Sequence, residues 1–220
     1  MKLHRHRVVL DARPYTVITL RADAGVRFST NRFHETWHVI SDEAGAKTLA
    51  RLLWGLAYQR HPGTLVLIDG RHLDPNPFDA EPADPVVLLP AHSTVLTKQA
   101  ARALRRQSWT KPDGTVRWRT HGLDTRTAEF RQWQETPYGQ REYPFMPEPS
   151  GWETVERIGG LLVLAGSPQT LRQWAVYAEL MRITAPWDTD YEYLADREGE
   201  IQIFRNYHRE VGIARQARAD

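Results

Sequence analysis

Five consecutive residues carry the most specific chemical pattern in the chain. His34-Glu35-Thr36-Trp37-His38 reads H-E-x-x-H. On a helix, two histidines four residues apart share one face and bind Zn²⁺, and the glutamate between them activates a metal-bound water. His34 and His38 are therefore candidate metal ligands, and Glu35 is the candidate catalytic base of a zinc-dependent hydrolase.

The residues around this string favour a strand over the helix that the metal site requires. The string resembles that of the zinc proteases, but the resemblance covers these five residues alone. Ser41 is a good helix N-cap followed by two acidic residues, so a helix running through Ile40 would leave no connector before the next one. The stretch 33–40 is rich in β-forming residues. We predict a strand there, with His34 and His38 on one face and Glu35 on the other. The zinc hydrolase stays an alternative, and otherwise no cofactor is predicted.

Polar residues follow three apolar runs that are typical of strands buried on both faces. These runs are Thr64–Ile68, Val86–Leu89 and Leu161–Ala165. Ligands of open parallel sheets bind at the carboxyl ends of the strands, and a proline-rich loop over 73–85 could cover such a site. The candidate ligand-binding residues are Asp69, Arg71, His72, His92, Ser93 and Ser167. In the alternative interpretation the serines are helix N-caps, and the aspartate and arginine pair within their loop.

A basic segment interleaved with tryptophan lies in the middle of the chain. Lys98 to Arg131 holds nine basic and three acidic residues, a net charge of +6, so the rest of the chain sums to −4. A predicted helix over 94–107 places three cations at i, i+4 and i+8, and a predicted hairpin around Asp113-Gly114 adds two more. Cations contact phosphates and aromatic rings stack on bases. The candidate nucleic-acid-binding residues are Lys98, Arg102, Arg105, Arg106, Arg117, Trp118 and Arg119. The alternative is a solvated helix face with tryptophans in the core.

These candidate residues are positioned by a mixed α/β fold in which helices flank a partly parallel sheet. Short strands open the chain, and helices are predicted to begin at Ser41, near Ser93 and at Ser167. A hairpin around 197–199 is expected near the C-terminus. Residues 1–220 are interpreted as one domain with an irregular basic and aromatic insertion around 108–155.

The amino-acid composition narrows the classes of protein and of site that the chain can belong to. The chain of 220 residues has no cysteine, which excludes disulfides, thiolate metal sites and cysteine nucleophiles. No apolar run approaches the roughly 20 residues of a membrane span, and the N-terminus lacks the apolar region of a signal peptide. We expect a cytoplasmic protein with no membrane partner.

The leading hypothesis is a binding protein for an anionic partner, nucleic acid or a nucleotide-like ligand, which contacts the basic residues and the strand-end crevice. One alternative is the zinc-dependent hydrolase. The other is a protein–protein interaction module without catalysis, which an apolar patch of exposed tryptophans would favour.

Overall fold

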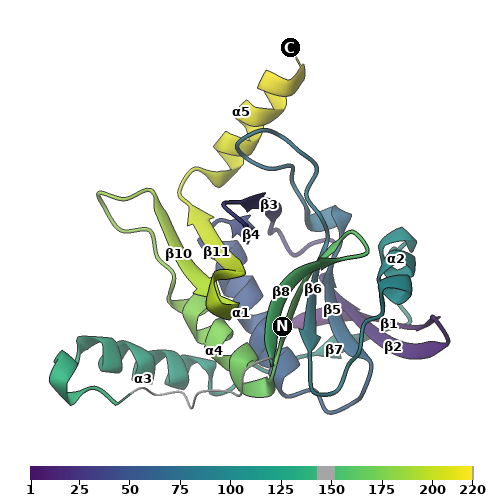
Figure 1. Ribbon diagram of the computed structural model, residues 1–220, viewed down its shortest axis with the longest axis horizontal. Coiled ribbons are helices and arrows are strands. Elements are labelled where there is room, and N and C mark those ends of the chain that lie inside the picture. Colours follow the sequence, from purple (N-terminus) through teal and green to yellow (C-terminus); the bar gives the residue numbers. More distant parts are fainter. Residues whose placement is uncertain (143–151, 220) are drawn as a thin grey trace.

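The structure is a computed structural model that describes residues 1–142 and 152–219. The described residues form a seven-stranded sheet, a four-stranded sheet and five α-helices (Figure 1). Both sheets mix parallel and antiparallel pairs. The predicted mixed α/β fold is therefore confirmed.

The seven-stranded sheet, here called the large sheet, forms most of the core. Its strands, in spatial order, are β7 (Gly114–Arg117), β1 (Lys2–Leu10), β2 (Arg13–Thr19), β5 (Thr64–Ile68), β6 (Val86–Pro90), β9 (Leu161–Gly166) and β8 (Glu153–Ile158). Every residue of β5, β6 and β9 is buried, because helices cover both faces of the sheet. The three apolar runs of the sequence are confirmed as central strands.

Side chains cap the first turn of three of the five described α-helices. The five helices are α1 (Glu43–Ala57), α2 (Lys98–Arg106), α3 (Leu123–Glu135), α4 (Pro168–Leu180) and α5 (Tyr207–Ala219). Ser167 caps α4 as predicted, whereas α1 and α2 begin after Asp42 and Thr97 rather than after Ser41 and Ser93. Ser41 ends the preceding strand instead, and its hydroxyl donates to a backbone carbonyl. α1 and α4 pack on one face of the large sheet and α2 on the other.

The central strands do not all run in the same direction. β6 and β9 are parallel, but β5 and β6 are antiparallel, with Ile68 opposite Val86. The carboxyl end of β5 therefore lies at one end of the strands, and the carboxyl ends of β6 and β9 lie at the opposite end. The expectation that three strand ends meet in one crevice is wrong, because the connection from β5 to β6 contains only the short 3-10 turn Gly70–His72 and no crossover α-helix.

The four-stranded sheet, here called the small sheet, contains the H-E-x-x-H string. Its strands, in spatial order, are β10 (Thr189–Leu194), β11 (Gly199–Phe204), β4 (Thr36–Ser41) and β3 (Ser29–Phe33). The C-terminal hairpin predicted from the sequence is confirmed as β10 and β11. β3 and β4 form a second hairpin, whose two turn residues have φ of +47° at His34 and +68° at Glu35. Positive φ at both central residues is the geometry of a type I′ turn.

This hairpin corrects the prediction of a continuous strand over 33–40. The chain reverses at His34 and Glu35, so His34 does not share a strand face with His38. The helix that a zinc-protease site requires is not formed here either, since Thr36–Ser41 is a strand.

Three further features differ from expectation. β7 pairs with β1 instead of forming a hairpin around Asp113-Gly114, because the Asp113 carboxylate accepts from Arg5 Nε and the Arg7 amide. Within the stretch predicted to be irregular, α3 forms, and residues 143–151 of that stretch lie outside the described residues. α5 was not predicted, and it projects from the small sheet (Figure 1).

None of the described helices combines the length and the apolar character needed to cross a membrane.

Candidate functional site

A large cavity lies against one face of the small sheet. Its volume is about 850 Å³, and it is bounded by β3, β4, β10 and β11 on one side and by residues 76–84 of the proline-rich loop on the other. We call it the small-sheet cavity. A pocket of this size that collects polar groups from separate elements is where a binding site is expected.

The hairpin turn positions His38 in this cavity. Because the turn takes two residues, Asn31 of β3 lies directly opposite His38 of β4. His38 Nδ1 lies 2.6 Å from Asn31 Oδ1. An amide oxygen only accepts, so Nδ1 is the protonated nitrogen and Nε2 keeps its lone pair. Burial lowers the pKa of His38 below its ordinary value, which favours the neutral imidazole.

Glu200 of β11 lies next to His38 because β11 runs parallel to β4 with the two residues in register. Glu200 Oε2 is 3.9 Å from His38 Nε2, and the Gln202 amide donates to the other carboxylate oxygen. Each of the two residues is only 5% exposed, and burial raises the pKa of Glu200. The same burial thus favours the neutral forms of both groups and brings their pKa values closer together, an arrangement suited to proton transfer.

The loop wall of the cavity continues this polar network. Asn31 Nδ2 donates to Asn76 Oδ1 at 3.3 Å, and Asn76 Nδ2 donates to Asp79 Oδ1 at 2.7 Å. Asn76 is itself buried. The orientation of the histidine is therefore set by a chain of amide side chains that ends in the loop.

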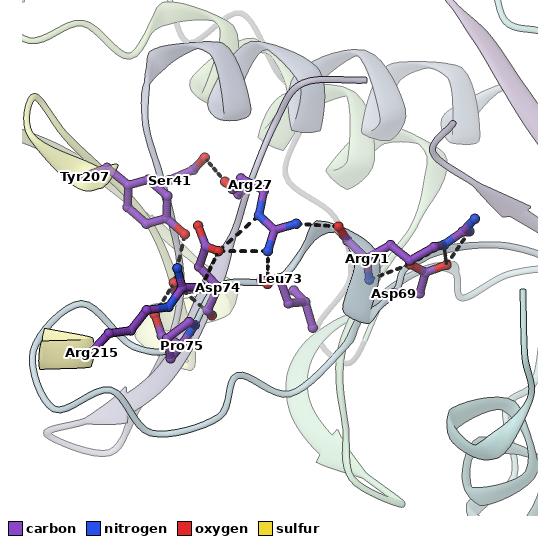
Figure 2. A network of polar contacts seen from close by, with 10 residues as sticks. Arg27, Ser41, Asp69, Arg71, Leu73, Asp74, Pro75, Tyr207 and Arg215 are labelled. Atoms are coloured by element: carbon purple, nitrogen blue, oxygen red, sulfur yellow. Dashed lines mark hydrogen bonds and ion pairs between the residues drawn. The ribbon is translucent and has the colours of Figure 1, made fainter. Parts of the chain in front are cut away.

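The loop is fixed in place by a buried carboxylate at its start. Asp74 Oδ1 accepts from Arg27 Nη2 at 2.8 Å and from Arg215 Nη2 of α5 at 3.0 Å (Figure 2). The Arg27 guanidinium also donates to the backbone carbonyls of Arg71 and Leu73. An arginine that holds a carboxylate and two carbonyls together makes the loop part of the folded core.

The mouth of the cavity is aromatic. Phe33, Phe78 and Tyr191 line it and are all more than half exposed. Phe78 contacts Phe204 of β11 edge to face, with ring centroids 5.7 Å apart. Exposed aromatic side chains around a pocket provide contact area for an apolar or flat part of a ligand.

The charge of the lining excludes a simple anion site. Four carboxylates line the cavity against two guanidiniums: Asp79, Glu81, Asp84 and Asp190 against Arg32 and Arg157. Both oxygens of Asp84 accept from Arg157, at 2.6 and 3.1 Å, so that arginine is already neutralised. Phosphate or carboxylate groups would be repelled by the remaining acids.

The string H-E-x-x-H is divided by the fold. His34 and Glu35 are exposed at the tip of the β3–β4 hairpin, while His38 is buried beside Glu200. The described residues contain no group of three or more His, Cys, Asp or Glu side chains arranged to hold a metal ion. Sequence reasoning singled out His38, as a candidate metal ligand, and did not identify its neighbours in the fold, Asn31 and Glu200. A two-residue turn at 34–35 is the signal that would have paired Asn31 with His38.

The predicted strand-end residues are separated. Asp69 and Arg71 form an ion pair at 2.6 Å, and Asp69 also caps the 3-10 turn that follows β5, so they pair within their loop. His72 is buried, and no hydrogen bond to its Nε2 is found among the described residues. His92, Ser93 and Ser167 lie at the other edge of the sheet, and Ser167 is the α4 N-cap.

The predicted basic residues are exposed, but the tryptophans among them are not. Lys98, Arg102, Arg105 and Arg106 are exposed on α2, and Arg117 and Arg119 are exposed on β7 and just after it. Trp118 is 7% exposed and lies against Gly55 of α1, and Trp109 is 5% exposed. Both rings belong to the core, so nucleic-acid bases cannot stack on them.

Comparison with known proteins gives no relative from which a function could be transferred: no family model, no curated protein and no solved structure matches the chain.

Proposed function

We propose that the protein binds a small organic molecule in the small-sheet cavity and that His38 accepts a proton from it. The ligand is uncharged or positively charged. It places an apolar or flat part at the aromatic mouth and a hydroxyl or N–H group near His38.

One observation carries this proposal: the buried histidine His38 lines a cavity of about 850 Å³, and the buried carboxylate of Glu200 lies 3.9 Å from its Nε2. Asn31 holds the His38 ring with Nε2 unprotonated, so this nitrogen is ready to act as a base. Glu200, whose pKa burial raises, lies beside this nitrogen but does not line the cavity, so it is a neighbour of the base and not a proton donor to the ligand. Groups with shifted pKa values in a cavity are typical of functional sites.

The anionic partner predicted from the sequence does not suit this cavity, because its lining is acidic. The cations on which that prediction depends lie on α2, a separate part of the surface. The zinc-hydrolase alternative assigned His38 to a metal. The proposed role uses the same residue as a base and assigns none to His34 or Glu35.

A fragment screen followed by nitrogen-15 NMR of the histidine rings tests the proposal. Neutral and cationic fragments that bind should shift the ring resonances of His38 and leave those of His34 unchanged. His38→Gln should remove the dependence of fragment affinity on pH near the histidine pKa. His34→Gln is the matched control, since that ring is exposed only four residues away. Fragments that bind without affecting His38, or equal effects of the two substitutions, would contradict the proposal.

A further inference from the structure

The exposed side of α2 is uniformly cationic. We call Lys98, Arg102, Arg105 and Arg106 the α2 surface. Lys98, Arg102 and Arg106 follow one another at i, i+4 and i+8, so they share a stripe along the helix. The opposite side packs on the large sheet through Ala100, Ala101 and Leu104. The helix is therefore anchored by its apolar side while its charged side faces solvent.

These charges are not neutralised within the described part of the chain. None of the four forms an ion pair there, and α2 contains no acidic residue. Among acids on neighbouring elements, Asp11 accepts from the Thr97 hydroxyl, and Glu156 is exposed on β8. Cations held by a rigid helix without partners attract an external anion at little cost in desolvation.

A smaller cavity extends the surface at the end of α2. Its volume is about 280 Å³, and Arg105 lines it together with the hydroxyl-bearing Ser108 and Thr110 and with the Asp69–Arg71 ion pair, so Arg105 is its unpaired guanidinium among the described residues. Arg71 was predicted as a strand-end ligand residue, and here it lies beside one arginine of the basic segment. Guanidinium and hydroxyl groups are common donors to phosphate oxygens.

We propose that the α2 surface binds nucleic acid through its phosphate backbone, independently of base sequence. Lys98 to Arg106 spans roughly 12 Å of helix, and one strand of a DNA duplex presents about three to four phosphates over that length. Three of the four cations are arginines, which bind phosphate in bidentate geometry. The α2 surface contains no apolar side chain that would enter a membrane, which disfavours anionic lipid as the partner. Buried Trp109 and Trp118 leave no stacking platform, so the contacts are to phosphate rather than to bases.

The test measures fluorescence anisotropy of a labelled mixed-sequence DNA duplex with the full chain over a range of salt concentrations. The logarithm of affinity should fall with the logarithm of salt concentration with a slope of about −3, and a duplex of scrambled sequence should bind equally. The combined variant K98E/R102E/R106E should bind at least about tenfold more weakly with a much smaller slope. The matched control R60E/R182E/R209E changes net charge equally at exposed arginines outside the α2 surface and should bind like the wild type.

Both variants should fold, because every substituted side chain is exposed, and circular dichroism checks this. Undetectable binding at low salt, affinity independent of salt, or equal weakening by the control variant would overturn the proposal. Equally tight binding of polyglutamate would also overturn it, because the surface would then suit an acidic protein. None of these results bears on the small-sheet cavity, whose fragment binding is measured separately.

Discussion

At the scale of single residues, the candidate site depends on which nitrogen of His38 carries the proton. Asn31 Oδ1 accepts from Nδ1, and this bond directs the lone pair of Nε2 towards Glu200. The sequence identified His38, although as a metal ligand. It could not identify Glu200, because strand pairing alone brings together residues that are 162 positions apart in number, His38 and Glu200.

Replacing the amide with a carboxylate should reverse the effect of burial on the histidine. In Asn31→Asp, a negative charge beside Nδ1 stabilises the imidazolium, so the pKa of His38 should rise by roughly 1 to 3 pH units. In Asn31→Ala the acceptor is lost and no charge is added, so the pKa should remain below its ordinary value of 6.5. A proton NMR titration of the His38 ring measures both. An unchanged pKa in Asn31→Asp would show that Asn31 does not contact the ring.

At the scale of elements, the fold shows where sequence patterns are ambiguous. β5 and β6 are apolar on both faces, so no alternation indicates their relative direction, and the antiparallel pairing could not be predicted. The β3–β4 hairpin was hidden for a different reason. His34 and Glu35 are unusual residues for a type I′ turn, where Asn-Gly is typical. Apolar runs and N-cap signals, by contrast, located the central strands and the start of α4 correctly.

Restoring the favoured turn residues should stabilise the hairpin. In the double variant H34N/E35G, both positions keep positive φ with less steric strain, so the free energy of unfolding should rise by about 1–2 kcal/mol. Urea denaturation measures the change, and fragment binding in the small-sheet cavity should persist because both side chains are exposed and neither lines the cavity. A fall in stability would mean that the turn residues make interactions that favour the native side chains.

At the scale of the whole molecule, charge is separated between two surfaces. The basic segment of the sequence forms the α2 surface, and carboxylates gather around the small-sheet cavity. The sequence predicted this asymmetry, with +6 in one segment and −4 in the remainder, but not that the acids would line a cavity. Their assembly requires β10 and the proline-rich loop, which are far apart in the chain, to line the same cavity. A long-range arrangement of this kind produces no local sequence pattern from which it could be predicted.

The buried titratable groups also make global stability depend on pH. Burial raises the pKa of Glu192 on β10 from 4.5 to about 7, and the nearby charge of Asp190 raises it further. The folded state therefore holds this proton more tightly than the unfolded chain does. The contribution of Glu192 to the free energy of unfolding is fully present below pH 4.5. It is lost as the pH rises from 4.5 to about 7, and the loss is at most about 3 kcal/mol.

Shifted pKa values of other buried groups also change stability within this pH range, some in the same direction as Glu192 and some in the opposite direction. Burial raises the pKa of Glu179 and Glu200, which adds to the loss as pH rises, while it lowers the pKa of His38 and His72, which costs stability as pH falls below 6.5. Glu192→Gln removes the largest carboxylate contribution without changing the shape of the side chain. The variant should be more stable than the wild type at pH 8 and equally stable near pH 4, as measured by urea denaturation across this range. Glu156→Gln, at an exposed position on β8, is the control and should leave the pH profile unchanged. If the two substitutions had the same effect, the ionisation of Glu192 would not be coupled to folding.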